Sequence, residues 1–64
     1  MKNKINFYRK QKGITQEQLA ENLSVTRQTI NAIENDKYNP TLELAMKLGK
    51  FLGVPVEELF ILDK

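Results

Sequence analysis

Signals that start and stop helices recur at short intervals along the chain. Gly13 can adopt the left-handed conformation that ends a helix, and Thr15 followed by Gln18 has the pattern of a capping box that begins one. Thr26 and Thr41 are further N-cap candidates. The intervals leave no strand of normal length. The sequence therefore predicts an all-α fold, a compact domain of five short helices at residues 5–12, about 16–23, about 27–34, 42–52 and 56–60.

The length of the chain, 64 residues, leaves room for one small core and a single domain, residues 1–64. The chain contains no cysteine and no histidine, which removes disulfides, thiolate metal sites and the commonest general base. No apolar run approaches the roughly 20 residues that cross a bilayer, and MKNKINF lacks the apolar region of a signal peptide. We therefore expect a cytoplasmic protein that is not an enzyme and has no catalytic residues, cofactor, metal or membrane contact.

Charge is distributed unevenly between two parts of the chain. Residues 1–40 carry seven basic and four acidic side chains, a net charge of +3, whereas residues 41–64 carry three basic and four acidic ones, a net charge of −1. A positive bias of this size permits a polyanionic partner without identifying one.

The predicted helix at residues 27–34 has an unusual polar face. At 100° per residue, Ile30 and Ile33 form its buried stripe, and the opposite arc carries arginine, glutamine, asparagine and alanine with no carboxylate in the first two turns. Forked arginine and amide side chains can read guanine or adenine edges, and alanine can meet a thymine methyl group. A surface helix that is polar by chance is the alternative. A short preceding helix and a three-residue turn favour the helix-turn-helix unit, which inserts its second helix into the major groove of DNA.

Several motifs follow one another in a single order: TQEQLA, VTRQTINAIEN, NPTLELA, LGV and ELF. With them the sequence resembles the lambda-repressor/Cro-like helix-turn-helix proteins, the Xre family, and especially their short single-domain bacterial members. The resemblance covers residues 5–60 without a gap. It implies a helix-turn-helix at about residues 16–35, with the helix at about 27–34 as the recognition helix in the major groove.

The resemblance also implies roles for individual residues. Arg27 and Gln28 match the family's base-reading positions, and Asn31 and Ala32 are further candidates on that face. Arg9 and Glu34 match an ion pair between the first and third helices, for which we favour a structural role over DNA contact. Contacts to the DNA backbone are expected from Gln16, Thr26, Thr29, Asn35, Lys37 and Tyr38.

Two positions depart from the family pattern. Ser24 stands in the turn between the second and third helices, and Asp36 follows the third helix, where glycine is usual. A serine at positive φ costs about 1 kcal/mol, which a fold can tolerate, and aspartate accepts left-handed geometry better than most residues.

Some apolar residues exceed what one small core needs. Phe7 points away from Ile5 and Tyr8 on the first helix, and the chain ends in the β-favouring tripeptide Phe60, Ile61 and Leu62. We expect these four residues, Phe7 with 60–62, to form a homodimer interface, with a short β pairing between residues near 2–4 and 60–62. Closure of the core is the alternative role. The resemblance implies a dimer on a palindromic operator with half-sites about 34 Å apart.

The sequence therefore predicts a transcriptional regulator, a repressor, that binds double-stranded DNA sequence-specifically. An antitoxin whose main partner is a toxin protein is the alternative, because some family members have that role. Any regulatory signal would act on this domain or through a second regulatory protein.

Overall fold

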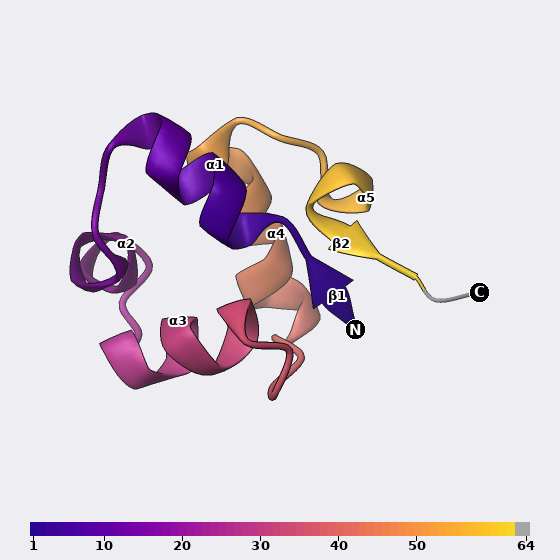
Figure 1. Cartoon of the computed structure of the whole chain (residues 1–64), viewed down its shortest axis with the longest axis horizontal. Coiled ribbons are helices and arrows are strands. Elements are labelled where there is room, and N and C mark those ends of the chain that lie inside the picture. Colours follow the sequence, from indigo (N-terminus) through magenta and orange to yellow (C-terminus); the bar gives the residue numbers. More distant parts are fainter. Residues whose placement is uncertain (63–64) are drawn as a thin grey trace.

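The computed structural model describes residues 1–62, in which five helices surround a common centre with a short strand before the first helix and after the last (Figure 1). The predicted all-α class and its five helices are confirmed. In chain order the elements are β1 (Lys2–Asn3), α1 (Ile5–Lys12), α2 (Gln16–Asn22), α3 (Arg27–Glu34), α4 (Leu42–Leu52), α5 (Val56–Leu59) and β2 (Phe60–Ile61).

The helix ends follow the local signals in the sequence. The hydroxyl of Thr15 accepts a hydrogen bond from the backbone N of Gln18 at 3.0 Å, and the Gln18 side chain accepts one from the Thr15 N–H at 2.8 Å, which completes the capping box. Thr26 and Thr41 cap α3 and α4 in the same way, each accepting from the backbone N–H three residues ahead. These hydroxyls satisfy N–H groups that the first turn of a helix leaves without a partner.

The two expected positive-φ residues lie two positions after the last residues of α2 and α3. Ser24 has φ 59° and Asp36 has φ 61°, the left-handed region that costs a residue with a Cβ roughly 1 kcal/mol. Backbone hydrogen bonds hold both turns, because Val25 N donates to Ala20 O at 3.0 Å and Lys37 N donates to Ala32 O at 2.9 Å. The turn after α2 therefore has a fixed geometry, and α3 leaves it in a defined direction.

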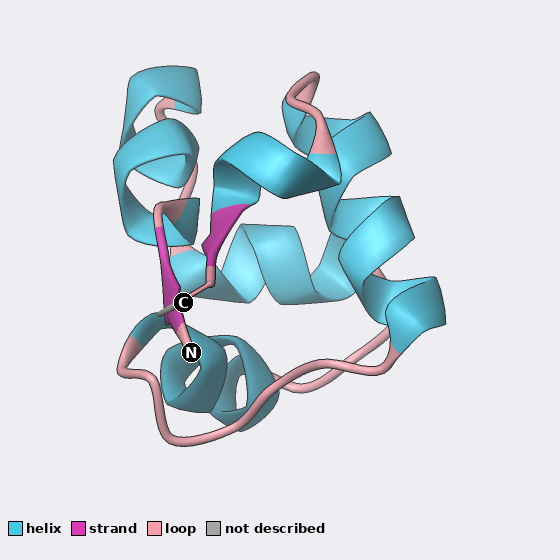
Figure 2. Cartoon of the chain, turned by 90° about the vertical axis from the view of Figure 1, so that its right-hand side faces the viewer, coloured by secondary structure: helices cyan, strands magenta, loops and turns pink. Residues whose placement is uncertain are grey.

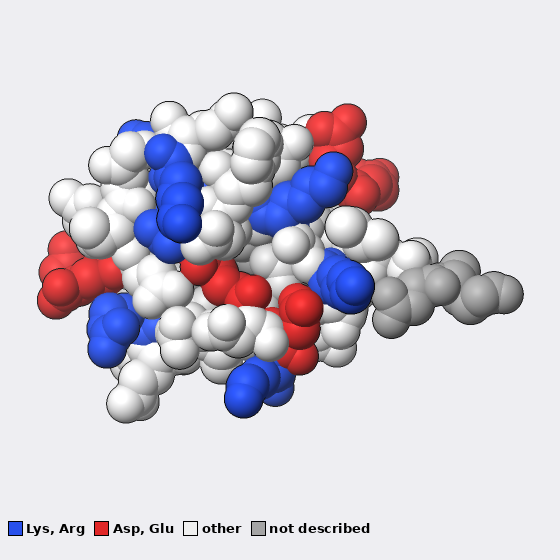
Figure 3. Space-filling model, in the orientation of Figure 1, with Lys and Arg blue, Asp and Glu red and all other residues white. Residues whose placement is uncertain are grey.

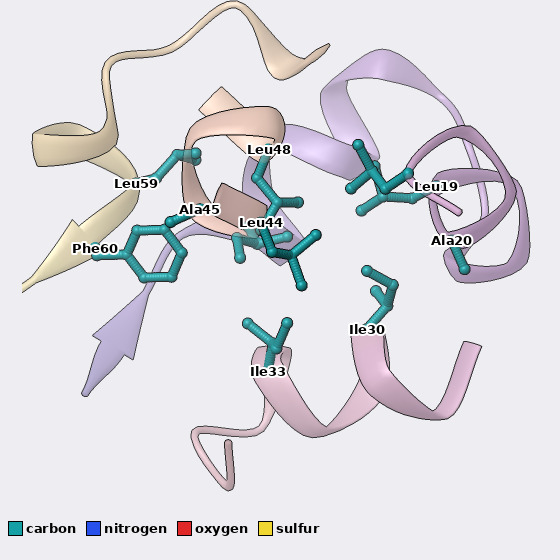
Figure 4. Close-up of a cluster of buried hydrophobic side chains, with 11 residues drawn as sticks. Leu19, Ala20, Ile30, Ile33, Leu44, Ala45, Leu48, Leu59 and Phe60 are labelled. Atoms are coloured by element: carbon teal, nitrogen blue, oxygen red, sulfur yellow. The ribbon is translucent and has the colours of Figure 1, made fainter. Parts of the chain in front are cut away.

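One cluster of apolar side chains forms the core. Figure 4 shows side chains from α2, α3, α4, α5 and β2 pointing into the same space. Leu19, Leu48 and Leu59 are fully buried, and Ile30 and Ile33 of α3 are 1% exposed. Burial of that stripe fixes the rotation of α3 about its own axis, so its opposite face is turned outward.

The two ends of the chain pair with each other. β1 and β2 form an antiparallel ladder in which Lys2 lies opposite Ile61 and Asn3 opposite Phe60 (Figure 2). The predicted β pairing is therefore present within a single chain. It also ends α5 at Leu59, one residue earlier than predicted, because Phe60 turns to φ −116° and ψ 138° to join the strand.

Phe60 corrects one part of the dimer expectation. Its side chain is 9% exposed and belongs to the core beside Ala45 (Figure 4). Closing the core, the alternative role considered for the tail, is therefore the role of Phe60. Ile61 and Leu62, at 40% and 78% exposed, remain at the surface with Phe7. Among the described residues, no helix is long and apolar enough to cross a membrane.

Candidate nucleic-acid interface

α2 and α3 form a compact pair joined by the turn at residues 23–26. In Figure 1, α2 is seen end-on while α3 runs across the view, so the two helices cross steeply. Leu19 and Ala20 of α2 pack in the same core cluster as Ile30 and Ile33 of α3. Because the buried stripe of each helix faces the other, α3 is held against α2 with one side left free.

The free side of α3 carries most of the predicted base-reading residues. Arg27, Gln28 and Asn31 are exposed, whereas Ala32 is only partly exposed. Within residues 1–62, Arg27 forms no ion pair. The structure thus brings Arg27, Gln28 and Asn31 together on one open face and places Ala32 at its edge.

The residues expected to contact the DNA backbone surround this face. Thr26 lies at the start of α3, and its hydroxyl is 3.0 Å from that of Thr29. Lys37 and Tyr38 are exposed in the loop that follows α3. Figure 3 shows basic side chains near both ends of α3. In the sequence, Arg27 is the first residue of α3 and Lys37 lies three residues after its last.

A buried carboxylate lies behind the open face. Glu34 Oε2 accepts a hydrogen bond from Arg9 Nε at 2.7 Å, and Glu34 Oε1 accepts one from Arg9 Nη2 at 3.2 Å. The two side chains are only 3% and 10% exposed, respectively. Arg9 Nη1 also donates to the backbone O of Ile14 at 2.9 Å. This ion pair joins the last turn of α3 to α1 and to the loop before α2.

Two amide side chains complete the surroundings of Glu34. Asn6 Nδ2 and Gln16 Nε2 each donate to Glu34 Oε1 at 3.0 Å. The carboxylate is therefore bonded from α1 and from the first residue of α2. Asn6 did not emerge from sequence reasoning, although it precedes Arg9 by three residues and so shares a helix face with it.

Opposing effects act on the pKa of Glu34. Burial raises it, but the hydrogen bonds from Arg9, Asn6 and Gln16, with the positive charge of Arg9, outweigh burial and hold the pKa below its usual value. Glu34 is thus held as an anion.

Gln16 is also bonded to α3. Its Nε2 donates to Asn31 Oδ1 at 3.3 Å, in addition to its bond to Glu34. Asn35 Nδ2 donates to the same Asn31 Oδ1 at 3.1 Å and to the Asn31 backbone O at 2.8 Å. The Nε2 of Gln16 therefore has acceptors for both of its hydrogens within the chain, and a phosphate contact by this side chain requires one of them to be released.

Acid should weaken the fold through Glu34. A carboxyl whose pKa is lowered by folding contributes stability that is complete above its unfolded pKa, ordinarily about 4.5, and is lost as the pH falls through the folded value. We expect the free energy of unfolding of the wild type to fall more steeply below about pH 4.5 than that of Glu34→Gln, which cannot titrate there. Urea denaturation of both proteins at several pH values would measure this, and parallel curves would contradict it.

Comparisons with known proteins agree with this geometry. The profile of a family described as helix-turn-helix matches residues 5–59. The chain is 54% identical over 63 residues to an uncharacterized HTH-type transcriptional regulator of Methanocaldococcus jannaschii, covering 98% of this chain and 96% of that protein. It is 44% identical over 64 residues to an uncharacterized HTH-type transcriptional regulator of Bacillus subtilis, covering 100% and 97%. It is also 39% identical over 56 residues to the cryptic phage CTXphi transcriptional repressor of Vibrio cholerae, covering 88% and 50%. The similarity therefore extends to archaeal as well as bacterial proteins.

Proposed function

The chain belongs to the helix-turn-helix family of DNA-binding transcriptional regulators, and from this premise we propose that it is a sequence-specific repressor. In this proposal α3 enters the major groove, where Arg27 and Gln28 read base edges with Asn31 and Ala32 beside them. The relatives' names describe transcriptional regulators, which favours this function over an antitoxin role.

The single observation that supports the proposal best is the open face of α3. Arg27, Gln28 and Asn31 are exposed side by side on a helix whose other face is anchored in the core. Base readout requires forked donors held on a rigid element, and α3 supplies both. Contacts to the DNA backbone around this face are proposed for four exposed residues, Thr26, Asn35, Lys37 and Tyr38, and two partly buried ones, Gln16 and Thr29. Such contacts would set the position of the protein along the DNA without reading sequence.

Selection from a random DNA pool tests sequence specificity directly. We expect the purified protein to enrich one operator sequence with two half-sites related by a two-fold axis. Enrichment should be lost for a triple variant in which Arg27, Gln28 and Asn31 are alanine, while its helical content is unchanged. If the wild type enriches no sequence, or the triple variant enriches the same one, readout by α3 is wrong.

In vitro transcription tests the repressor role. An operator placed across a promoter should block initiation when the protein is added, because the bound domain and RNA polymerase compete for the same DNA. The Vibrio cholerae relative is named a transcriptional repressor, which supports this role. Transcription that rises with added protein would instead identify an activator.

We further propose that the protein binds its operator as a homodimer. An apolar groove lies between α4, α5 and β2, and Leu42, Ile61 and Leu62 are among its lining residues. Leu42 is 74% exposed, and Met46, one turn further along α4, is 51% exposed. A second copy would remove these side chains from water.

The surroundings of the groove suit a two-fold pair. Glu57 lines the groove, and Glu43, Lys47 and Lys50 line a second hollow that shares Leu42 with it, so two copies related by a two-fold axis can bring opposite charges together. α5 and β2 also lie at the opposite end of the molecule from α2 (Figure 1). A dimer through the groove would therefore leave α2 clear of the interface.

Polar substitutions in the groove, at Leu42, and beside it, at Met46, should separate the dimer. We expect sedimentation of the wild type as a dimer at tens of micromolar and of Leu42→Asp/Met46→Gln as a monomer, because the pair loses its apolar contact. Aspartate in the first turn of α4 suits the helix dipole, so folding should be retained.

Phe7→Ser is the matched control, because the proposed groove dimer leaves out Phe7, which the sequence predicts to lie in the interface. Phe7 is 54% exposed, packs edge-on against Tyr8, and does not line the groove. This variant should remain dimeric. A monomeric wild type would contradict the dimer, and a monomeric Phe7→Ser variant would move the interface to α1.

A further inference from the structure

The side-chain amide of Asn31 is oriented by its neighbours. Its Oδ1 accepts from Gln16 Nε2 at 3.3 Å and from Asn35 Nδ2 at 3.1 Å. Within residues 1–62, its Nδ2 donates to no side-chain or backbone oxygen. The carbonyl end of the amide is thus engaged by the protein, and the N–H end is free.

The chemistry of the neighbours forces this orientation. Gln16 Nε2 also faces a carboxylate oxygen of Glu34, which can only accept, because the pKa of that carboxyl is held low. Asn35 Nδ2 also faces the backbone O of Asn31, which likewise can only accept. Both neighbours must therefore present N–H groups to Asn31. If the Asn31 amide were flipped, its NH₂ group would meet two donors.

An asparagine oriented in this way differs from one that is free to turn. A free asparagine can read adenine with two hydrogen bonds, accepting from N6 and donating to N7. With its oxygen engaged, Asn31 presents only donors. In the major groove the keto oxygens, O6 of guanine and O4 of thymine, accept such a donor. Cytosine presents only an amino donor there, and the one acceptor of adenine, N7, lies beside an amino group that opposes the donor.

We propose that Asn31 acts as a donor-only specificity residue and selects a keto base, guanine or thymine, on the strand that it contacts. Gln16 and Asn35 are its positioning residues, and Glu34 fixes Gln16 in turn. The buried ion pair behind α3 therefore determines which bases its outer face accepts. This inference rests on the proposed readout of DNA by α3.

Single-atom base analogues in the selected operator test the contact. Replacing guanine by 2-aminopurine removes O6, and replacing thymine by 5-methyl-2-pyrimidinone removes O4. Made at one keto base in one half-site, this change should lower wild-type affinity about fivefold, the value of one neutral hydrogen bond, and should not further lower the affinity of Asn31→Ala. Replacing adenine by purine, or cytosine by 2-pyrimidinone, removes the amino group and should show no dependence on Asn31.

The positioning residues have their own test. In Gln16→Met/Asn35→Ala the oxygen of Asn31 is released, so the amide can turn and accept. We expect this variant to gain sensitivity to removal of an amino group at the Asn31 position. Gln28→Ala is the matched control, since it alters the same face without touching these hydrogen bonds, and it should keep the keto preference of Asn31.

A measurement on the free protein separates this inference from the proposed function. In NMR spectra the side-chain amide protons of Gln16 should exchange slowly with water, and those of Asn31 should exchange as fast as those of Gln28. Equal protection of Asn31 and Gln16 would overturn the orientation whatever the protein binds.

The DNA-binding experiments also distinguish failure of this inference from failure of the proposed function. Two results would overturn the inference and leave DNA readout by α3 intact. In the first, the contribution of Asn31 to wild-type affinity depends on a base amino group. In the second, it depends on no base at all, while Arg27 and Gln28 each read one. If no operator is enriched, the proposed readout fails and the keto selection falls with it.

Discussion

Glu34→Gln is expected to lower the free energy of unfolding by about 3–5 kcal/mol, because it leaves the buried guanidinium of Arg9 without its counter-ion. A domain of this length has a total stability of about 3–10 kcal/mol, so the variant should be close to unfolding at room temperature. Chemical denaturation followed by circular dichroism measures the change. An unchanged midpoint would show that the pair contributes little.

The chain offers a matched control for this effect. Lys47 Nζ lies 3.3 Å from Glu43 Oε2 on α4, but those side chains are 53% and 79% exposed. Lys47→Gln should cost less than about 0.5 kcal/mol, because water screens an exposed pair. A comparable loss in both variants would mean that burial is not the cause.

Arg27→Ala is expected to weaken operator binding by about 1–3 kcal/mol, roughly 5- to 150-fold, and binding to random DNA much less. The physical reason is loss of a guanidinium that reads a base edge, which affects the preferred sequence only. Titrations of operator and random duplexes at one fixed salt concentration measure both affinities.

The position of Arg27 sharpens this prediction. It occupies the first turn of α3, which contains no acidic residue, so its charge opposes the helix dipole. Arg27→Ala should therefore keep or slightly raise stability. Lys4→Ala, the same charge change at an exposed residue outside α3 and the proposed dimer groove, should weaken both duplexes slightly and equally. Equal losses on operator and random DNA for Arg27→Ala would remove its base-reading role.

Most of the fold could be predicted from the sequence because its boundaries are set locally. Thr15, Thr26 and Thr41 each bond an N–H three residues ahead, and such short-range patterns are visible in the sequence. The fifth helix was predicted one residue too long. The helix ends at Leu59 because the next residue, Phe60, pairs with Asn3 near the other end of the chain. No local sequence signal predicts that contact.

The features of the candidate site that depend on local sequence could likewise be predicted, and those that depend on distant contacts could not. Periodicity alone predicts which face of α3 is outward, and the resemblance supplied Arg9 and Glu34. The direction of the Asn31 amide could not be predicted, because it requires Gln16 from another helix and a carboxylate held in its charged state. Asn6 was missed for a similar reason, since its bond to Glu34 spans 28 residues.

The antiparallel pairing of β1 with β2 has a kinetic consequence. Contacts between α2 and α3 close short loops, whereas the ladder between residues 2–3 and 60–61 closes a loop of nearly the whole chain. Loop closure costs more entropy as the loop lengthens, and distant contacts form after nearby ones. We therefore expect the helix pair that carries the open face to assemble first during folding. Residues 2–3 and 60–61 should pair last, on a scaffold that has already formed.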